Sequence, residues 1–133
     1  MKTNKLYFVS AILLLFISQT IFSQTVKKGT WDRQNKSIKG TWEVVTKDDG
    51  TYIVFSDNFK TKKAPDLELF LSTKKAKDVN KKKVIQEATS VSKLKSYKGG
   101  QSYKLPSSLK IEDFSSIIIH CRDYNIFWGA GNL

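Results

Sequence analysis

The chain contains one cysteine, Cys121, which follows three consecutive isoleucines and His120. A single thiol cannot form a disulfide within its own chain, so it is either a small buried hydrophobic group or a nucleophile that meets a partner. The chemistry open to such a thiol is sulfenic acid formation, a mixed disulfide or thiol exchange. Cys121 is therefore the candidate redox group, and a structural cysteine packed between sheets is the alternative.

Three side chains are candidates for tuning this thiol. A thiol becomes more reactive when nearby positive charge or hydrogen-bond donors favour the thiolate and when solvent reaches the sulfur. Arg122 and His120 flank Cys121, although neighbours along a strand point to opposite faces. Asp66 would oppose ionisation of the thiol if it lay close, because like charges repel. It is better suited to partner a hydroxyl, a backbone turn or His120.

The same residues do not assemble a cofactor site. Blue copper needs two histidines, a cysteine and a weak axial ligand, and zinc needs three or four converging ligands. Covalent haem needs two cysteines and a histidine in close spacing. The chain has one histidine and one cysteine, and its only methionine is Met1. We therefore expect no cofactor and no metal within one subunit. No Ser/His/Asp or paired-carboxylate arrangement indicates a hydrolase, and enzymatic activity is left open.

The first residues have the pattern of a secretory signal peptide. Lys2 and Lys5 precede an apolar run over residues 6–17, and a more polar segment ends at Ser23. The run is shorter than the roughly 20 residues that a membrane-spanning helix needs, although an uncleaved anchor is the alternative. We expect residues 1–23 to be removed before Gln24 and the protein to be exported to the periplasm or the exterior. A lone thiol is unusual in such an oxidising compartment.

The chain is strongly basic, with 23 lysines and arginines against 12 acidic residues and a formal net charge of +11. Such a charge is compatible with nucleic acid, anionic glycans or a membrane surface. Only Arg33 and Arg122 are arginines, however, and the lysines are spread over residues 60–63, 74–83 and 93–104. Because arginine is the usual group for reading phosphate, nucleic-acid binding is not expected. Most lysines are interpreted as a solvated surface, and contact with a membrane surface is left open.

Hydropathy alternation predicts an all-β fold, an antiparallel β-sandwich of about seven to nine short strands. An Asp-Gly step at residues 49–50 indicates a hairpin, and three isoleucines in a row indicate a central strand covered on both faces. Residues 24–37 are expected to be an extended lead-in, followed by one domain over residues 38–133. The expected strands cover residues 40–46, 51–55, 66–71, 91–97, 101–105, 115–121 and 124–129, with 84–88 as a short strand or a single turn.

An ordered set of segments carries a resemblance to a known family. The segments are Asn58-Phe59-Lys60-Thr61, Ala64-Pro65-Asp66-Leu67 with the strand to Leu71, Leu94 followed by Gly99 or Gly100, Tyr103-Lys104-Leu105-Pro106, Ser116 to Cys121, and Tyr124 to Ala130. Over about residues 38–133 the chain resembles the DM-thirteen domain family, the Skeletor-type module often called an electron-transfer domain. The resemblance implies a β-sandwich and a redox role, and it places the family's single cysteine on Cys121. His120 departs from the pattern, because the family often has an aromatic residue there.

Two functions follow as expectations. The first is an exported domain with a redox or electron-transfer role through Cys121, with His120, Arg122 and Asp66 as tuning residues and a redox protein or other thiol as partner. The alternative is a non-catalytic extracellular binding or adhesion module in which the cysteine is structural and a basic, aromatic surface recognises the partner. The solvent exposure of Cys121 and the charged atoms around it distinguish the two.

Overall fold

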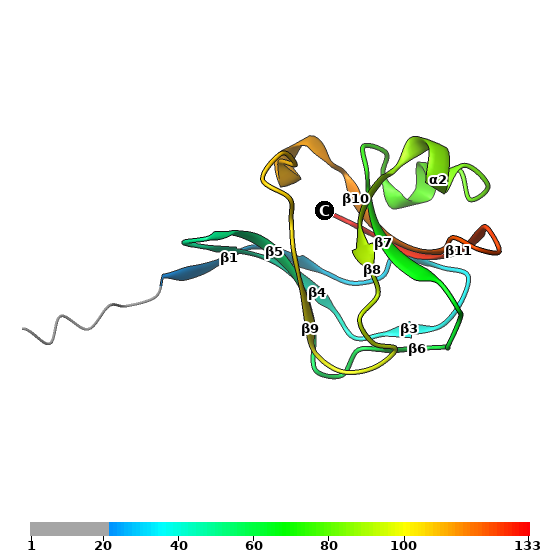
Figure 1. Cartoon of the computed structure of the whole chain (residues 1–133), viewed down its shortest axis with the longest axis horizontal. Helices are drawn as coiled ribbons and strands as arrows, with labels where there is room; N and C mark the ends of the chain where they lie inside the picture. The colour runs from blue at the N-terminus through cyan, green and yellow to red at the C-terminus, as the bar shows by residue number, and fades with distance from the viewer. Residues whose placement is uncertain (1–21) are drawn as a thin grey trace, which may run out of the picture.

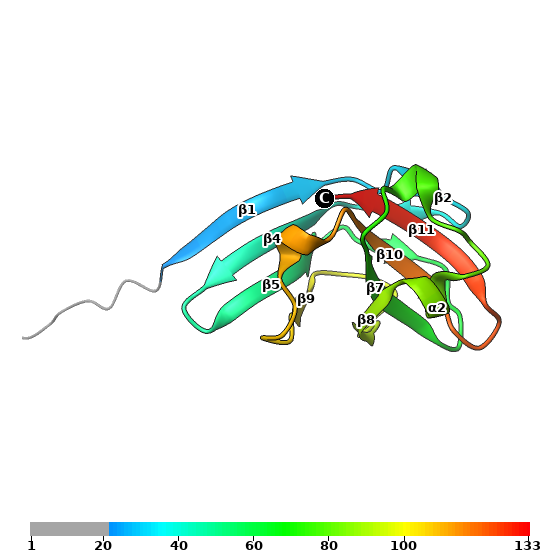
Figure 2. The same cartoon turned by 90° about the horizontal axis from the view of Figure 1, so that it is seen from above.

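The computed structural model describes residues 22–133, so the predicted signal peptide lies outside the described residues apart from its last two positions. Eleven strands form three antiparallel sheets in this part of the chain. The prediction of an all-β sandwich is confirmed, because the two larger sheets face each other across one hydrophobic core (Figures 1 and 2). Three strands, β2, β3 and β6, are only two residues long, which is too short for alternation to reveal.

The first sheet has the order β1-β4-β5-β9. Its strands are β1 (Ser23–Gly29), β4 (Trp42–Lys47), β5 (Gly50–Phe55) and β9 (Gln101–Lys104). The predicted hairpin joins β4 to β5, with Gly50 just after the turn at a positive φ of 143° that favours glycine. Alternation then turns Val44, Ile53 and Tyr103 toward the second sheet, where all three are buried.

The second sheet has the order β2-β11-β10-β7-β8. Its strands are β2 (Arg33–Gln34), β11 (Ile126–Asn132), β10 (Ser116–Cys121), β7 (Leu67–Ser72) and β8 (Thr89–Lys93). β10 is central and all six of its residues are buried, as the isoleucine run predicted. Ile117 and Ile119 join the core between the sheets, whereas Ile118 joins a second apolar cluster on the outer face.

A short helical layer covers this outer face. It consists of the 3-10 turn η1 (Ala76–Asp78) and the single-turn helix α2 (Val84–Glu87), so residues 84–88 form a turn of helix instead of a strand. Val84 and Ala76 pack on Phe70 and Ile118 in the second cluster, and Figure 1 shows α2 over this side of the sheet. No helix within residues 22–133 is long and apolar enough to cross a membrane.

The segment expected as an extended lead-in, residues 24–37, is extended over β1 and supplies strands to both sheets. Its aromatic residue, Trp31, is buried and packs edge-on against Phe55, with ring centroids 5.4 Å apart. A small third sheet pairs β3 (Ile38–Lys39) with β6 (Lys60–Thr61), and a 3-10 turn, η2 (Ile111–Asp113), precedes β10.

The last strand differs from its predicted range, because β11 covers Ile126–Asn132 instead of residues 124–129. Asn125 has a positive φ of 49° and belongs to the β10–β11 turn, which delays the start of the strand. Gly129 and Gly131 lie in β11 at positions where residues of other elements approach its backbone closely. A Cβ on Gly131 would lie 2.5 Å from both Thr30 O and Trp42 Nε1, two atoms joined by a hydrogen bond of 3.0 Å.

We predict that Gly131→Ala lowers the free energy of unfolding by about 1–3 kcal/mol, because the new methyl group collides with a backbone carbonyl and an indole nitrogen. Gly129→Ala is the matched control: its closest obstacle, at 2.5 Å, is Ile38 Cδ1, the end of a side chain that can move, and its nearest backbone atom, Arg33 O, is farther away at 3.1 Å. Urea unfolding of both variants measures the two losses in free energy of unfolding. The loss should be larger for Gly131→Ala, and equal losses would contradict the prediction.

Candidate functional site

Cys121 lies at the end of β10 and faces the core between the two sheets. Its exposed fraction is 0%, and it belongs to the same cluster as Leu67, Ile119 and Trp128. Its paired neighbours across the sheet are Leu67 of β7 and Ile126 of β11. In the closed fold the thiol is therefore a small hydrophobic group without access to solvent.

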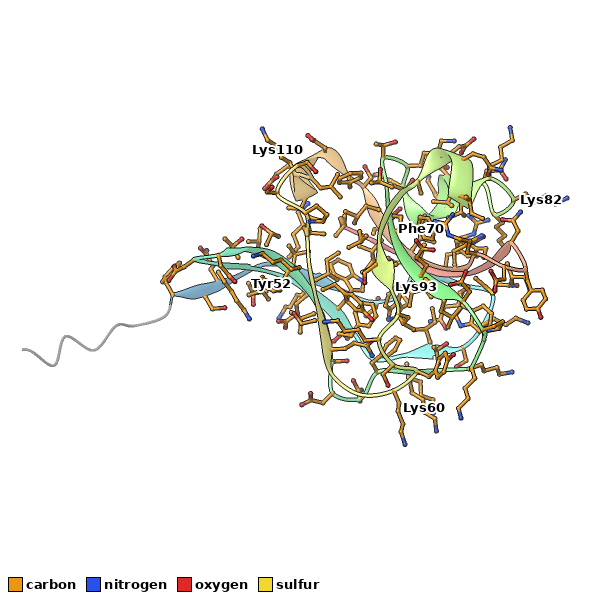
Figure 3. The ribbon with its side chains drawn as sticks, viewed as in Figure 1. Tyr52, Lys60, Phe70, Lys82, Lys93 and Lys110 are labelled. Carbon is orange, nitrogen blue, oxygen red and sulfur yellow. The ribbon has the colours of Figure 1, made fainter. Side chains whose placement is uncertain are left out.

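His120 lies on the opposite face of β10, under the helical layer, as the alternation of a strand requires. It is 0% exposed, and its ring meets Phe70 edge-on at 6.0 Å (Phe70 is labelled in Figure 3). Asn125 Nδ2 donates to Lys82 O at 3.1 Å, so its Oδ1 is free to accept from His120 Nε2 at 2.9 Å. Nδ1 is then a buried nitrogen without a hydrogen-bond partner among the described residues.

Burial is the main cause that lowers the pKa of His120 below its ordinary value of 6.5, and the Arg122 charge acts in the same direction. The hydrogen bond to Asn125 and the charge of Glu68 act against this shift. The histidine is consequently a neutral ring at neutral pH, which makes it a polar packing group beside Phe70. It cannot act directly on the Cys121 sulfur from the other side of the strand.

Arg122 is committed to a carboxylate that sequence reasoning missed. Its Nε donates to Glu68 Oε2 at 2.6 Å and its Nη2 to Glu68 Oε1 at 3.0 Å, which forms a bidentate ion pair. Ser90 Oγ also donates to Glu68. The Arg122 hydrogen bonds, followed by that of Ser90, lower the pKa of Glu68, whose side chain is only 8% exposed. Arg122 also lies over the Phe70 ring, 5.4 Å from its centroid.

Asp66 contacts this region through its backbone and not through its carboxylate. Its carbonyl oxygen accepts from the Arg122 N–H at 3.0 Å, which ties the β10–β11 turn to the start of β7. Its carboxylate lies 3.7 Å from Lys93 Nζ on β8. The Asp66 carboxylate thus lies beside a lysine, and none of the three partners expected for it (a hydroxyl, a backbone turn or His120) is among its hydrogen bonds in the described residues.

The four predicted residues thus separate into three environments around one strand end. Cys121 is in the core, His120 is under the helical layer, and Arg122 with Asp66 closes the turn at the rim. The signal for Glu68 was present in the sequence, because a lone acid on the same face as Phe70 in an alternating strand needs a basic partner when it is buried. No group of three or more His, Cys, Asp or Glu side chains arranged for a metal is found in residues 22–133.

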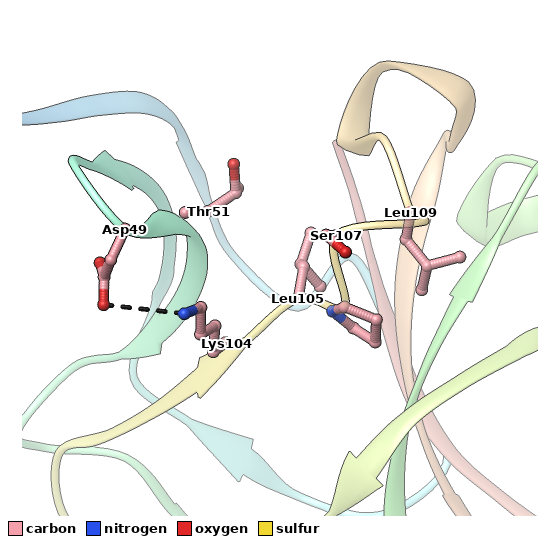
Figure 4. A pocket seen from close by; sticks show the side chains of 8 residues that line it. Asp49, Thr51, Lys104, Leu105, Ser107 and Leu109 are labelled. Atoms are coloured by element: carbon pink, nitrogen blue, oxygen red, sulfur yellow. Dashed lines mark ion pairs between the residues drawn. The ribbon is translucent and has the colours of Figure 1, made fainter.

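A separate cleft of about 540 Å³ lies between the β4–β5 turn and the loop after β9 (Figure 4). Asp49 and Lys104, which both line it, form an ion pair at 3.7 Å, and Tyr52 Oη donates to Asp49 at 2.7 Å. Leu105, Pro106 and Leu109 supply apolar side chains to its lining. The cleft holds none of the predicted site residues. Nearby Tyr103 is buried with its pKa raised to about 12 by burial, and it accepts a hydrogen bond from Lys95 N–H.

Comparison with models of known protein families gives a match over most of the chain. The family model described as electron transfer DM13 matches residues 30–133, which takes in Cys121 and all the elements from β2 to β11. The match begins eight residues before the expected domain start at residue 38 and includes the buried Trp31. No curated protein and no solved structure matches the chain.

We predict that His120→Phe removes a step in the pH dependence of stability. Because the folded pKa is below 6.5, the unfolded chain takes up the proton first, so the free energy of unfolding falls as pH drops below 6.5. Phenylalanine has no proton to take up and fills the same apolar site. Urea unfolding at a series of pH values measures the step, and a step of unchanged size in the variant would contradict the assignment.

We predict a second step at lower pH that depends on Glu68. The pKa of Glu68 is lowered in the fold from its ordinary 4.5, so its stabilisation is present above that value and is lost as pH falls below it. Glu68→Gln should flatten this step and enlarge the His120 step, because the Glu68 charge no longer opposes the lowering of the His120 pKa. Glu87→Gln, which breaks the exposed pair with Lys74 at 2.8 Å, is the matched control and should destabilise less.

Proposed function

The chain belongs to the electron transfer DM13 family, and we propose that it is an exported electron-transfer domain whose redox group is the Cys121 thiol. One observation carries the proposal: Cys121 is the last residue of β10, directly before the turn at residues 122–125. A thiol at a strand end is exposed when one turn opens, whereas a thiol in mid-strand is exposed only when the sheets separate.

Thiol chemistry in this domain requires an opened form, because the closed fold leaves the sulfur 0% exposed. Two interactions of Arg122 hold the turn closed: its N–H donates to Asp66 O, and its guanidinium pairs with Glu68. Both interactions lie at the rim, and the Arg122 side chain is 39% exposed. Local opening would break these two interactions, together with the Asn125 hydrogen bonds to His120 and Lys82, and turn the strand end outward.

The proposed reaction is thiol–disulfide exchange with a partner protein. The Cys121 thiolate attacks one sulfur of a partner disulfide, the partner S–S bond breaks, and the second partner sulfur leaves as a thiolate. The electron donor is a dithiol: its first thiolate attacks the Cys121 sulfur of the mixed disulfide and releases the remaining partner sulfur as a thiolate. Its second thiolate then attacks the donor sulfur now joined to Cys121, which forms the donor disulfide and releases the Cys121 thiolate. Two electrons pass from donor to acceptor, and the domain returns to its starting state.

Export would bring the domain to a compartment in which partner disulfides persist. The proposal of export is supported by the basic N-terminal region and the apolar run within residues 1–17, and by the small residue Ser23 before Gln24. Cleavage at that point would leave β1 paired with β4 from Gln24 onward, because only the Ser23–Lys47 pair is lost. N-terminal sequencing of the protein recovered outside the cytoplasm should begin at Gln24.

We predict that Cys121 in the folded protein reacts with a small alkylating reagent through an opening that costs less free energy than global unfolding. Alkylation rates, referred to the rate of the unfolded chain, give the opening free energy, and urea unfolding gives the global value. Arg122→Gln should raise the rate about tenfold, which corresponds to about 1.4 kcal/mol of easier opening. Lys110→Gln, which removes an exposed charge elsewhere, should leave the rate unchanged.

The second candidate is a non-catalytic binding module in which Cys121 is structural, and the complete burial of the sulfur among isoleucines favours it. In that case the opening and global free energies are equal in the wild type, and Arg122→Gln speeds alkylation only as much as it destabilises the fold. Gly131→Ala, a destabilising change far from the turn, calibrates that relation. Such a result would overturn the redox proposal, and Cys121→Ala would leave partner binding intact.

A further inference from the structure

Three lysines stand in a row across the small third sheet. Lys39 of β3 pairs with Lys60 of β6, and Lys60 forms an isolated β-bridge with Lys98. Residues that pair directly project to the same side, so these three side chains, which we call the lysine ladder, project together. Their inward neighbours Ile38 and Thr61 are 5% and 9% exposed, so the ladder faces solvent, as Figure 3 shows for Lys60.

Lys60 and Lys98 form a non-hydrogen-bonded antiparallel pair, the type in which the two Cα atoms lie closer together. Thr61 N donates to Tyr97 O at 2.8 Å and Gly99 N donates to Phe59 O at 2.8 Å, so the hydrogen bonds flank the pair instead of joining it. Such non-hydrogen-bonded pairs bring their Cα atoms to about 4.5 Å, nearer than hydrogen-bonded pairs. Like charges placed directly opposite destabilise a sheet, so the arrangement has an electrostatic cost when no anion is present.

No carboxylate offsets this charge within the described part of the chain. The ion pairs there engage Lys74, Lys93, Lys104 and Arg122, and none engages a ladder lysine. Asp57 lies beside Gly100, close to one end of the ladder, without forming an ion pair with it. Lys62 and Lys63 follow β6 directly and are exposed, so the positive charge continues past the ladder.

We propose that the lysine ladder is a binding site for an anionic polysaccharide, whose carboxylate or sulfate groups lie across β3, β6 and the neighbouring segment that holds Lys98. Neighbouring strands are about 4.8 Å apart, so the ladder presents ammonium groups at a regular step along a line. A linear chain with a charge on successive sugar units matches such a line. The lysine ammonium is a compact donor that pairs with either anion without a fixed planar geometry.

The surroundings of the ladder favour a polysaccharide over nucleic acid or lipid. Both arginines are engaged elsewhere, Arg33 with the carbonyl oxygens of Ala76 and Val79 and Arg122 with Glu68. The large hydrophobic side chains that are exposed in residues 22–133 are Phe22, Val26 and Tyr124, which lie at or on β1 and in the β10–β11 turn. The ladder therefore offers no stacking platform for bases and no apolar group to enter a bilayer.

The test compares two triple variants of the full domain with equal loss of charge. Lys39→Gln/Lys60→Gln/Lys98→Gln removes the ladder, and Lys28→Gln/Lys77→Gln/Lys110→Gln removes three exposed lysines from separate elements. Binding to immobilised heparin and to polygalacturonate is measured at about 0.15 M salt, where scattered surface charge is screened. We expect the ladder triple to bind at least about tenfold more weakly and the control triple to stay within about twofold of the wild type.

Equal loss of affinity in both triples would overturn the proposal, because the binding would then follow net charge. Vesicles with anionic lipids and a single-stranded oligonucleotide are run in parallel, and ladder-dependent binding to either that matches heparin would overturn the polysaccharide assignment. The ladder triple should be at least as stable as the wild type, since it loses like-charge repulsion. Lys60→Glu, a single reversal at the centre of the ladder, provides a second variant and should also abolish binding.

Discussion

The structure depends on the central strand β10, which is buried on both faces. Such a strand needs apolar residues on both of its faces. Ile117 and Ile119 face the inner core, and Ile118 faces the helical layer. The next two residues continue the alternation, so His120 and Cys121 are carried into two different interiors. The burial of the Cys121 thiol is therefore a consequence of the strand. The alternation set by the three isoleucines directs the Cys121 side chain into the core, whatever the chemistry of that side chain.

The alternation that defines β10 also explains how far the sequence predicts the site. Opposite faces for His120 and Cys121 follow directly from a period of two, and both were expected on that basis. The depth of His120 was not predictable, because it depends on the single-turn helix α2 and on η1, which cover the outer face. Residues 74–83 are rich in lysine, so hydropathy marks them as a surface excursion although Ala76 and Val79 are buried within it.

The polar contacts at the strand end were missed for a related reason. Glu68 and Arg122 are 54 residues apart, and they meet only because β7 and β10 pair in a register that places His120 opposite Glu68. Strand alternation gives the face of each residue but not the register between strands, which the turns and bulges of the whole sheet determine. The irregularity between Ile119 and His120 in the β10–β11 pairing is one such feature, and it lets Trp128 enter the core.

Trp128 connects this core to the lysine ladder. Its Nε1 donates to Thr61 Oγ1 at 2.8 Å, and Thr61 Oγ1 in turn donates to Ser37 O at 2.8 Å, so β3 and β6 are fixed from the inside while their lysines repel on the outside. Scattered charges are enough to protect a sheet edge from pairing with another chain. That role does not require lysines placed directly opposite one another. The buried hydrogen bonds prevent the opposed lysines from moving apart. An anion that binds them therefore removes their repulsion, and this contributes to the free energy of binding.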